Sequence, residues 1–233
     1  MTVTPEVNVE PAEYHRLLGY PRGAVLSERA RELADWACEW YRQHGRPWTF
    51  ERQVESVDSL PFESARLKQT LAQAEAHSAF LVAASAGPEL EEHARTLWAD
   101  ERPDEYFFLE IFGSAVVEHL ITVTGARLCA WAEARAMAVL PHFSPGYADW
   151  DISEQPRLLE LIGDGLPGKL EALESGALRP KKSQLAVFGL TRHTDRVRRL
   201  TDLVPCESCS FGPCQFRRAA YRRSMVYSTN LKA

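Results

Sequence analysis

The chain has 233 residues, of which 45% are hydrophobic and 25% charged, a composition ordinary for a globular protein with its own core. Its formal net charge of −5 argues against a general nucleic-acid binder, so no nucleic-acid partner is expected. Charged residues interrupt the apolar runs, which argues against a membrane span. The amino-terminal residues lack the pattern of a secretory signal, and an odd number of cysteines, five, is typical of a protein in a reducing compartment. These features predict a cytoplasmic protein without a membrane partner.

The predicted elements, taken along the chain, mix helices with a few separated strands. Residues 1–10 are expected to form a disordered tail. Further along the chain, apolar residues recur at helical spacing between Ser27, the expected N-cap, and Gly45, where the helix is expected to stop. The expected helices are 13–20, 27–44, 62–76, one opened by Gly87-Pro88, 104–139, 153–162 and 166–174, and the expected strands are 48–57, 80–85 and 185–190. This mixture without regular βαβ alternation predicts an α+β fold.

Two features of the long helical segment 104–139 leave alternatives open. Glu118 stands among apolar residues, and its carboxylate is either exposed to solvent or directed into a cleft. Gly113 and Gly125 mark either close packing or breaks in the helix.

The aromatic loop, residues 141–150, combines two prolines, a glycine, three aromatic side chains, a histidine and a carboxylate. Prolines stiffen the backbone, and a glycine lets another molecule approach it closely. Three rings on such a loop offer a stacking surface for a flat or sulfonium-bearing ligand. The alternative is a proline-rich connection packed on the core by its aromatic side chains.

Three cysteines near the carboxyl terminus, Cys206, Cys209 and Cys214, form a CxxCxxxxC motif. Such thiolates can ligate zinc or an iron–sulfur cluster, and the alternatives are a redox-active CxxC pair or three reduced thiols. Candidates for a fourth ligand include Cys38, Cys129 and His193, an exogenous ligand or a second chain. Arginines flank the motif and could stabilise thiolates, hold an acidic or phosphate-bearing partner, or form a solvated surface.

Several common catalytic signatures are missing from the sequence. It contains no GxGxxG, no Walker-type phosphate loop, no HExxH and no GxSxG. If the chain takes part in catalysis, we therefore expect a bound molecule to supply the reactive chemistry.

Four separated segments occur in an order that resembles a known family: 13–20, 80–89, 142–150 and 180–190. Together they resemble the activation (reactivation) domain of vitamin B12 (cobalamin)-dependent methionine synthase. The closer likeness is to its free-standing bacterial form, which ends in CxxCxxxxC followed by Phe-Arg-Arg, as Phe216, Arg217 and Arg218 do here. The likeness covers nearly the whole chain.

The resemblance implies a single α+β domain in which helices wrap a bent antiparallel sheet. Residues 11–204 would form the activation-like domain, and residues 205–223 would be a cysteine-rich, arginine-flanked segment packed on it. The family binds S-adenosylmethionine and docks over cobalamin held by a corrinoid-binding methyltransferase chain, with flavodoxin or ferredoxin as electron donor. The chain would then be a non-autonomous subunit of methionine synthase, a methyltransferase of methionine biosynthesis.

The ligand residues that the resemblance implies are Glu118, His142, Ser144, Gly146 and Tyr147. Where the synthase domain has an arginine, this chain has His142, which offers one neutral donor in place of a permanent bidentate charge. The competing hypothesis is an iron–sulfur or zinc redox or docking protein that serves another corrinoid system without binding S-adenosylmethionine.

Overall fold

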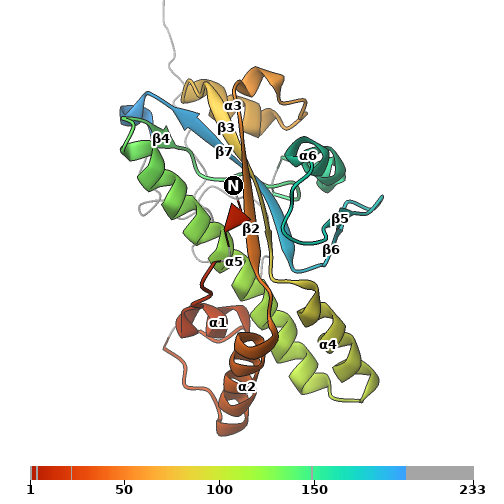
Figure 1. Ribbon diagram of the computed structural model, residues 1–233. Coiled ribbons are helices and arrows are strands. Elements are labelled where there is room, and N and C mark those ends of the chain that lie inside the picture. The colour runs from red at the N-terminus through yellow and green to blue at the C-terminus, as the bar shows by residue number, and fades with distance from the viewer. Residues whose placement is uncertain (1, 4, 22, 148, 198–233) are drawn as a thin grey trace, which may run out of the picture.

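The computed structural model describes residues 2–3, 5–21, 23–147 and 149–197, and Figure 1 shows their arrangement. This part of the chain is an α+β unit. Its six α-helices are α1 (Pro11–Leu17), α2 (Glu28–His44), α3 (Ala65–Gln73), α4 (Pro88–Ala99), α5 (Pro103–Glu133) and α6 (Gln155–Ile162). Its strands are β1 (Thr2–Val3), β2 (Trp48–Val54), β3 (Ser78–Ser85), β4 (Ala138–Val139), β5 (Glu171–Ala172), β6 (Leu178–Arg179) and β7 (Ser183–Thr191).

An antiparallel sheet of five strands in the order β1-β2-β3-β7-β4 forms the centre, and β5 pairs with β6 in a separate hairpin. Strand β3 lies between β2 and β7, with Phe80 opposite Phe188, and all eight of its residues are buried. A strand covered on both faces has no polar face, which explains its continuous apolar sequence.

Side chains of β3 alternate between two hydrophobic clusters, one on each face of the sheet. Phe80 and Val82 pack with residues of α1, α2, α4 and α5, whereas Leu81 and Ala83 pack with residues of α3 and α6. Figure 1 shows α5 running along one face, and α3 and α6 on the other side of the sheet. The predicted α+β class with an antiparallel sheet is confirmed.

Two helix starts follow their predicted signals. The Ser27 hydroxyl accepts a hydrogen bond from the Ala30 amide at the start of α2, which ends before Gly45. Gly87 precedes α4 with φ +93°, and Pro88 occupies the first turn.

Other predictions are corrected. Residues 166–174 do not form a helix: they contain turns and β5, because Gly165, with φ +97°, Pro167 and Gly168 interrupt helical backbone. The long helix ends at Glu133 and is followed by β4. Within the expected disordered tail 1–10, the backbone of Thr2–Val3 pairs with β2, and Val7 and Val9 pack on the core.

By length and composition α5 could cross a membrane, alone among the described helices and contrary to the sequence expectation. Of its most apolar window, 56% is buried inside the fold. The core helix of a globular protein meets the same criterion, so this feature is weak evidence for a membrane.

Candidate functional site

The aromatic loop is fixed to the edge of β7 by a pair of backbone hydrogen bonds. The Phe143 amide donates to the Val187 carbonyl at 2.9 Å, and the Val187 amide donates to the Phe143 carbonyl at 2.8 Å. Side chains alternate along extended backbone, so His142 and Ser144 point to the face opposite Phe143. That face is the one that α5 covers, because the His142 ring lies 5.5 Å from the ring of Phe188.

Two further backbone bonds fold the loop into turns around Gly146. The Tyr147 amide donates to the Ser144 carbonyl at 3.1 Å, and the Gly146 amide donates to the Trp150 carbonyl at 2.8 Å. Gly146 has φ +92°, a conformation that favours glycine. A Cβ there would come no closer than 3.8 Å to Ile152, so the backbone conformation and not crowding requires the glycine.

Four polar side chains then meet, and we call them the His142–Gln184 cluster: His142, Ser144, Tyr147 and Gln184. The Gln184 amide nitrogen donates to Ser144 Oγ at 2.9 Å and to Tyr147 Oη at 3.2 Å. His142 Nε2 lies 2.9 Å from the same Tyr147 oxygen. Ser144 is 3% exposed and Tyr147 is 37% exposed, so the cluster runs from the interior to the surface.

The three aromatic side chains of the loop have different roles. Trp150 is 2% exposed and packs against Phe62, with ring centroids 5.0 Å apart. Phe143 is half-buried against the same cluster, on the α3 and α6 face. Tyr147 is the exposed ring. Two of the three rings therefore pack the loop on the core, as the alternative interpretation expected, and a stacking role stays a prediction for Tyr147 alone.

A polar stripe on α5 accompanies the cluster on the same face of the sheet. Glu110, Ser114 and Glu118 follow one another at four-residue spacing and so share one side of the helix. Lys182 Nζ donates to Ser114 Oγ at 2.9 Å and lies 3.2 Å from a Glu110 carboxylate oxygen. Lys182 immediately precedes β7, two residues before Gln184, and its contact with Ser114 places its side chain on the α5 side of the sheet. The ligand role of Glu118, which is half-buried on this stripe, stays a prediction.

The Glu110 carboxylate partly neutralises the positive charge of Lys182. Glu110 is shared, because Lys181 Nζ lies 2.8 Å from its other carboxylate oxygen. Burial lowers the pKa of Lys182, although the Glu110 carboxylate opposes this shift.

The cysteine motif predicted to bind metal, Cys206, Cys209 and Cys214, lies outside the described residues. Cys38 and Cys129, which could have completed such a site, are half-buried on α2 and α5. Burial raises the pKa of Cys38 to about 11 and also raises that of Cys129, so both side chains favour the protonated thiol. His193 contacts Glu75 at 2.8 Å.

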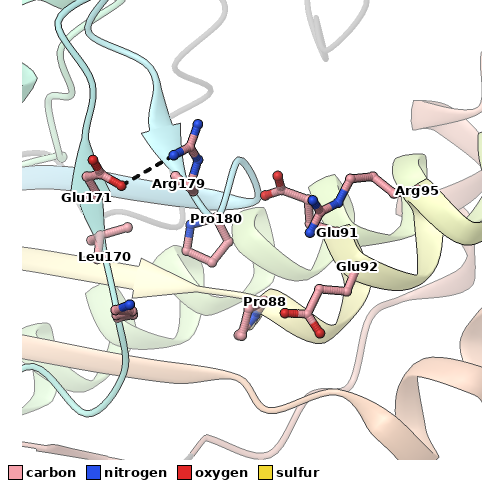
Figure 2. A pocket seen from close by; sticks show the side chains of 9 residues that line it. Pro88, Glu91, Glu92, Arg95, Leu170, Glu171, Arg179 and Pro180 are labelled. Carbon is pink, nitrogen blue, oxygen red and sulfur yellow. Dashed lines mark ion pairs between the residues drawn. The ribbon is translucent and has the colours of Figure 1, made fainter.

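Two cavities lie elsewhere on the described surface. One, of about 820 Å³, separates α4 from the β5–β6 hairpin, and Figure 2 shows carboxylates and cations on both of its walls. Its lining is Pro88, Glu91, Glu92, Arg95, Lys169, Leu170, Glu171, Arg179 and Pro180. The other, of about 480 Å³, is lined by Glu63, Ser64, Asp149, Asp151, Ser153, Glu154 and Arg157. Neither lining includes a residue of the His142–Gln184 cluster.

Sequence reasoning did not nominate Gln184 or Lys182. Both residues come just before the apolar run 185–190. Because side chains alternate along a strand, Gln184, which is four residues before Phe188, lies on the same face as Phe188, the face that α5 covers. The sequence carries no signal that the aromatic loop, some 40 residues earlier, pairs there. Neither a scan against protein-family models nor a search of the curated proteins found a match to this chain.

Proposed function

We propose that this chain binds S-adenosylmethionine at the His142–Gln184 cluster and presents its methyl group to cobalamin held by a partner methyltransferase, such as methionine synthase. The observation that supports the proposal is the exposed ring of Tyr147, whose hydroxyl group is fixed between Gln184 and His142. The sequence resemblance supplies the identity of the ligand and of the partner.

The cluster has the chemical groups that this ligand needs. An aromatic face attracts a positively charged group such as a sulfonium, and Tyr147 is the aromatic side chain of the loop that is exposed, at 37%. His142 and Gln184 provide polar atoms for the amino-acid end of the ligand, and Gly146 adds no side chain beside the tyrosine. His142 in place of an arginine makes the expected grip on a carboxylate weaker, since a neutral imidazole offers one donor.

The 37% exposure of Tyr147 suits presentation to a second protein. The methyl group must reach a cobalt atom that the partner chain holds, and a ligand enclosed in a cavity could not be approached by a corrinoid. The partner would supply the nucleophilic metal centre, and flavodoxin or ferredoxin would supply the electron. We therefore expect no turnover from the isolated chain.

Calorimetric titration of the full chain with S-adenosylmethionine tests the proposal. We expect saturable binding that weakens by about tenfold in Tyr147→Ala, because a cation–aromatic contact contributes up to about 2 kcal/mol. Trp98→Ala removes another exposed aromatic side chain, 64% exposed on α4, and should leave the affinity unchanged. Absence of binding by the wild type, or equal binding by Tyr147→Ala, would overturn the proposal.

A further inference from the structure

We infer that the cavity between α4 and the β5–β6 hairpin binds an acidic amino acid or a short acidic peptide, a ligand with one ammonium group and two carboxylates. The inference follows from the charged side chains that line the cavity and from their contacts with the described residues. It does not rest on the proposed function, because no residue of the His142–Gln184 cluster lines this cavity.

Both walls of the cavity are held in place by contacts with the rest of the fold. On the helix side, the Lys181 amide donates to Glu91 Oε2 at 2.9 Å. On the hairpin side, Leu178 is buried and Leu170 packs against the hydrophobic cluster of the α3 and α6 face. The cavity is therefore preformed, and its volume of about 820 Å³ lies within the range of about 300–1,000 Å³ typical of ligand pockets.

Three charged side chains of the lining are left without a counter-charge. Glu92 and Arg95 lie on α4, as Figure 2 shows, and Lys169 lies two residues before β5. All three are exposed. Within the ranges that the structure describes, their charged groups make no ion pair and no hydrogen bond. They are therefore available to a ligand.

The other charged groups of the lining have partners in the protein. Arg179 Nη1 lies 3.6 Å from Glu171 Oε2, the pair that is dashed in Figure 2. Exposed pairs of this kind contribute little to stability, but their charges offset each other. The Glu91 carboxylate accepts the Lys181 amide. The unpaired set is thus one carboxylate and two cations.

A ligand that complements this set carries two carboxylates and one ammonium group. A guanidinium binds a carboxylate through two N–H donors, so we assign the first carboxylate to Arg95. Glu92 precedes Arg95 by three residues and is its neighbour on the helix surface, so the ammonium group next to that carboxylate pairs with Glu92. Lys169, from the other wall, pairs with the second carboxylate. Glutamate and a short peptide that ends in glutamate have these groups.

The same set of charges disfavours other classes of ligand. S-adenosylmethionine has two positive charges and one carboxylate, the reverse of the complement. Inorganic phosphate would pair with Arg95 and Lys169 but would be repelled by Glu92, and a metal ion would meet the two cations. The cavity is therefore assigned a ligand different from that of the His142–Gln184 cluster.

An NMR titration of the ¹⁵N-labelled full chain with the tripeptide Ala-Ala-Glu tests the inference. We expect saturable shifts of the amide signals of Glu92 and Leu170. Two matched peptides each lack one charge: N-acetyl-Ala-Ala-Glu lacks the ammonium group, and Ala-Ala-Gln lacks the second carboxylate. Each should bind about tenfold more weakly, because a charge-assisted contact is lost. Free glutamate, titrated alongside, distinguishes the two sources of this chemistry, an amino acid and a peptide.

Lys169→Gln is the decisive variant. It removes the partner of the second carboxylate, so it should bind Ala-Ala-Glu and Ala-Ala-Gln equally. Lys68→Gln makes the same change at an exposed position on α3 and should keep the preference for glutamate. Arg95→Gln should weaken the binding of Ala-Ala-Glu by about tenfold, whereas Arg42→Gln, on the exposed surface of α2, should not.

Three results would overturn the inference: no saturable shifts with Ala-Ala-Glu or glutamate, equal affinity of the wild type for Ala-Ala-Glu and Ala-Ala-Gln, or a preference for glutamate that survives Lys169→Gln. The titration contains no S-adenosylmethionine, and Tyr147→Ala should bind Ala-Ala-Glu as the wild type does. Failure of this inference is therefore distinguishable from failure of the proposed function.

Discussion

Gly189 on β7 is the position where the sheet accommodates the start of the aromatic loop. The Leu140 amide donates to the Gly189 carbonyl at 2.8 Å, one residue before the loop begins. A Cβ at position 189 would lie 2.6 Å from Leu140 Cδ1 and 2.6 Å from Leu71 Cδ2. Both leucines are buried, at 4% and 6% exposure, so Gly189→Ala forces packed side chains to move.

The size of the effect follows from two opposing contributions. Overpacking a core costs about 1–3 kcal/mol, whereas replacing a strand glycine by alanine regains about 0.5–1 kcal/mol of unfolding free energy. Because the added Cβ meets two packed leucine side chains at once, we expect the free energy of unfolding to fall by about 1–2 kcal/mol in Gly189→Ala. For a chain of this size that corresponds to a fall of about 2–8 °C in Tm.

Urea unfolding of a double-mutant cycle with Leu140→Ala checks this reasoning. Leu140→Ala removes one of the two obstructing methyl groups, so the cost of Gly189→Ala should be smaller in that background. A Gly189→Ala variant at least as stable as the wild type would refute the argument from crowding. The same cost in both backgrounds would show that Leu140 is not the obstruction.

Two further predictions concern stability. Ser27→Ala should lower the free energy of unfolding by about 1 kcal/mol in a denaturant titration, because it removes the hydroxyl group that caps α2; unchanged stability would contradict this role of the cap. The second concerns His93, whose ring stacks on Trp40 with centroids 4.4 Å apart. Burial, with a smaller contribution from Arg102, lowers the pKa of His93 below its ordinary 6.5. The unfolded chain therefore binds more protons at position 93 between that lowered pKa and pH 6.5, and stability falls as the pH falls through this window. In His93→Gln the dependence of Tm on pH below 6.5 should be shallower, and identical slopes would refute the assignment.

Elements with local signals were predicted well from the sequence. The cap at Ser27 and the apolar run from Phe80 to Ser85 are encoded within a few residues, and α2 and β3 form where they were expected. The helix expected over 166–174 is wrong, because Gly165, Pro167 and Gly168 interrupt helical backbone there.

The candidate site was predictable only in part, since its geometry depends on distant pairing. Backbone pairing of Phe143 with Val187 decides which loop side chains are buried, and no local pattern distinguishes the buried Trp150 from the exposed Tyr147. His142 and Tyr147 contact each other directly, whereas the Ser144 side chain is joined to Tyr147 through Gln184, which lies 37 residues after Tyr147.

The most direct test of the central claim is to locate the ligand. The measurement is an intermolecular nuclear Overhauser effect between the ¹³C-labelled methyl group of S-adenosylmethionine and the full chain. The account predicts contacts to the ring protons of Tyr147 that disappear in Tyr147→Leu. Contacts to Leu170 in the cavity between α4 and the β5–β6 hairpin, or no contacts at all, would contradict it.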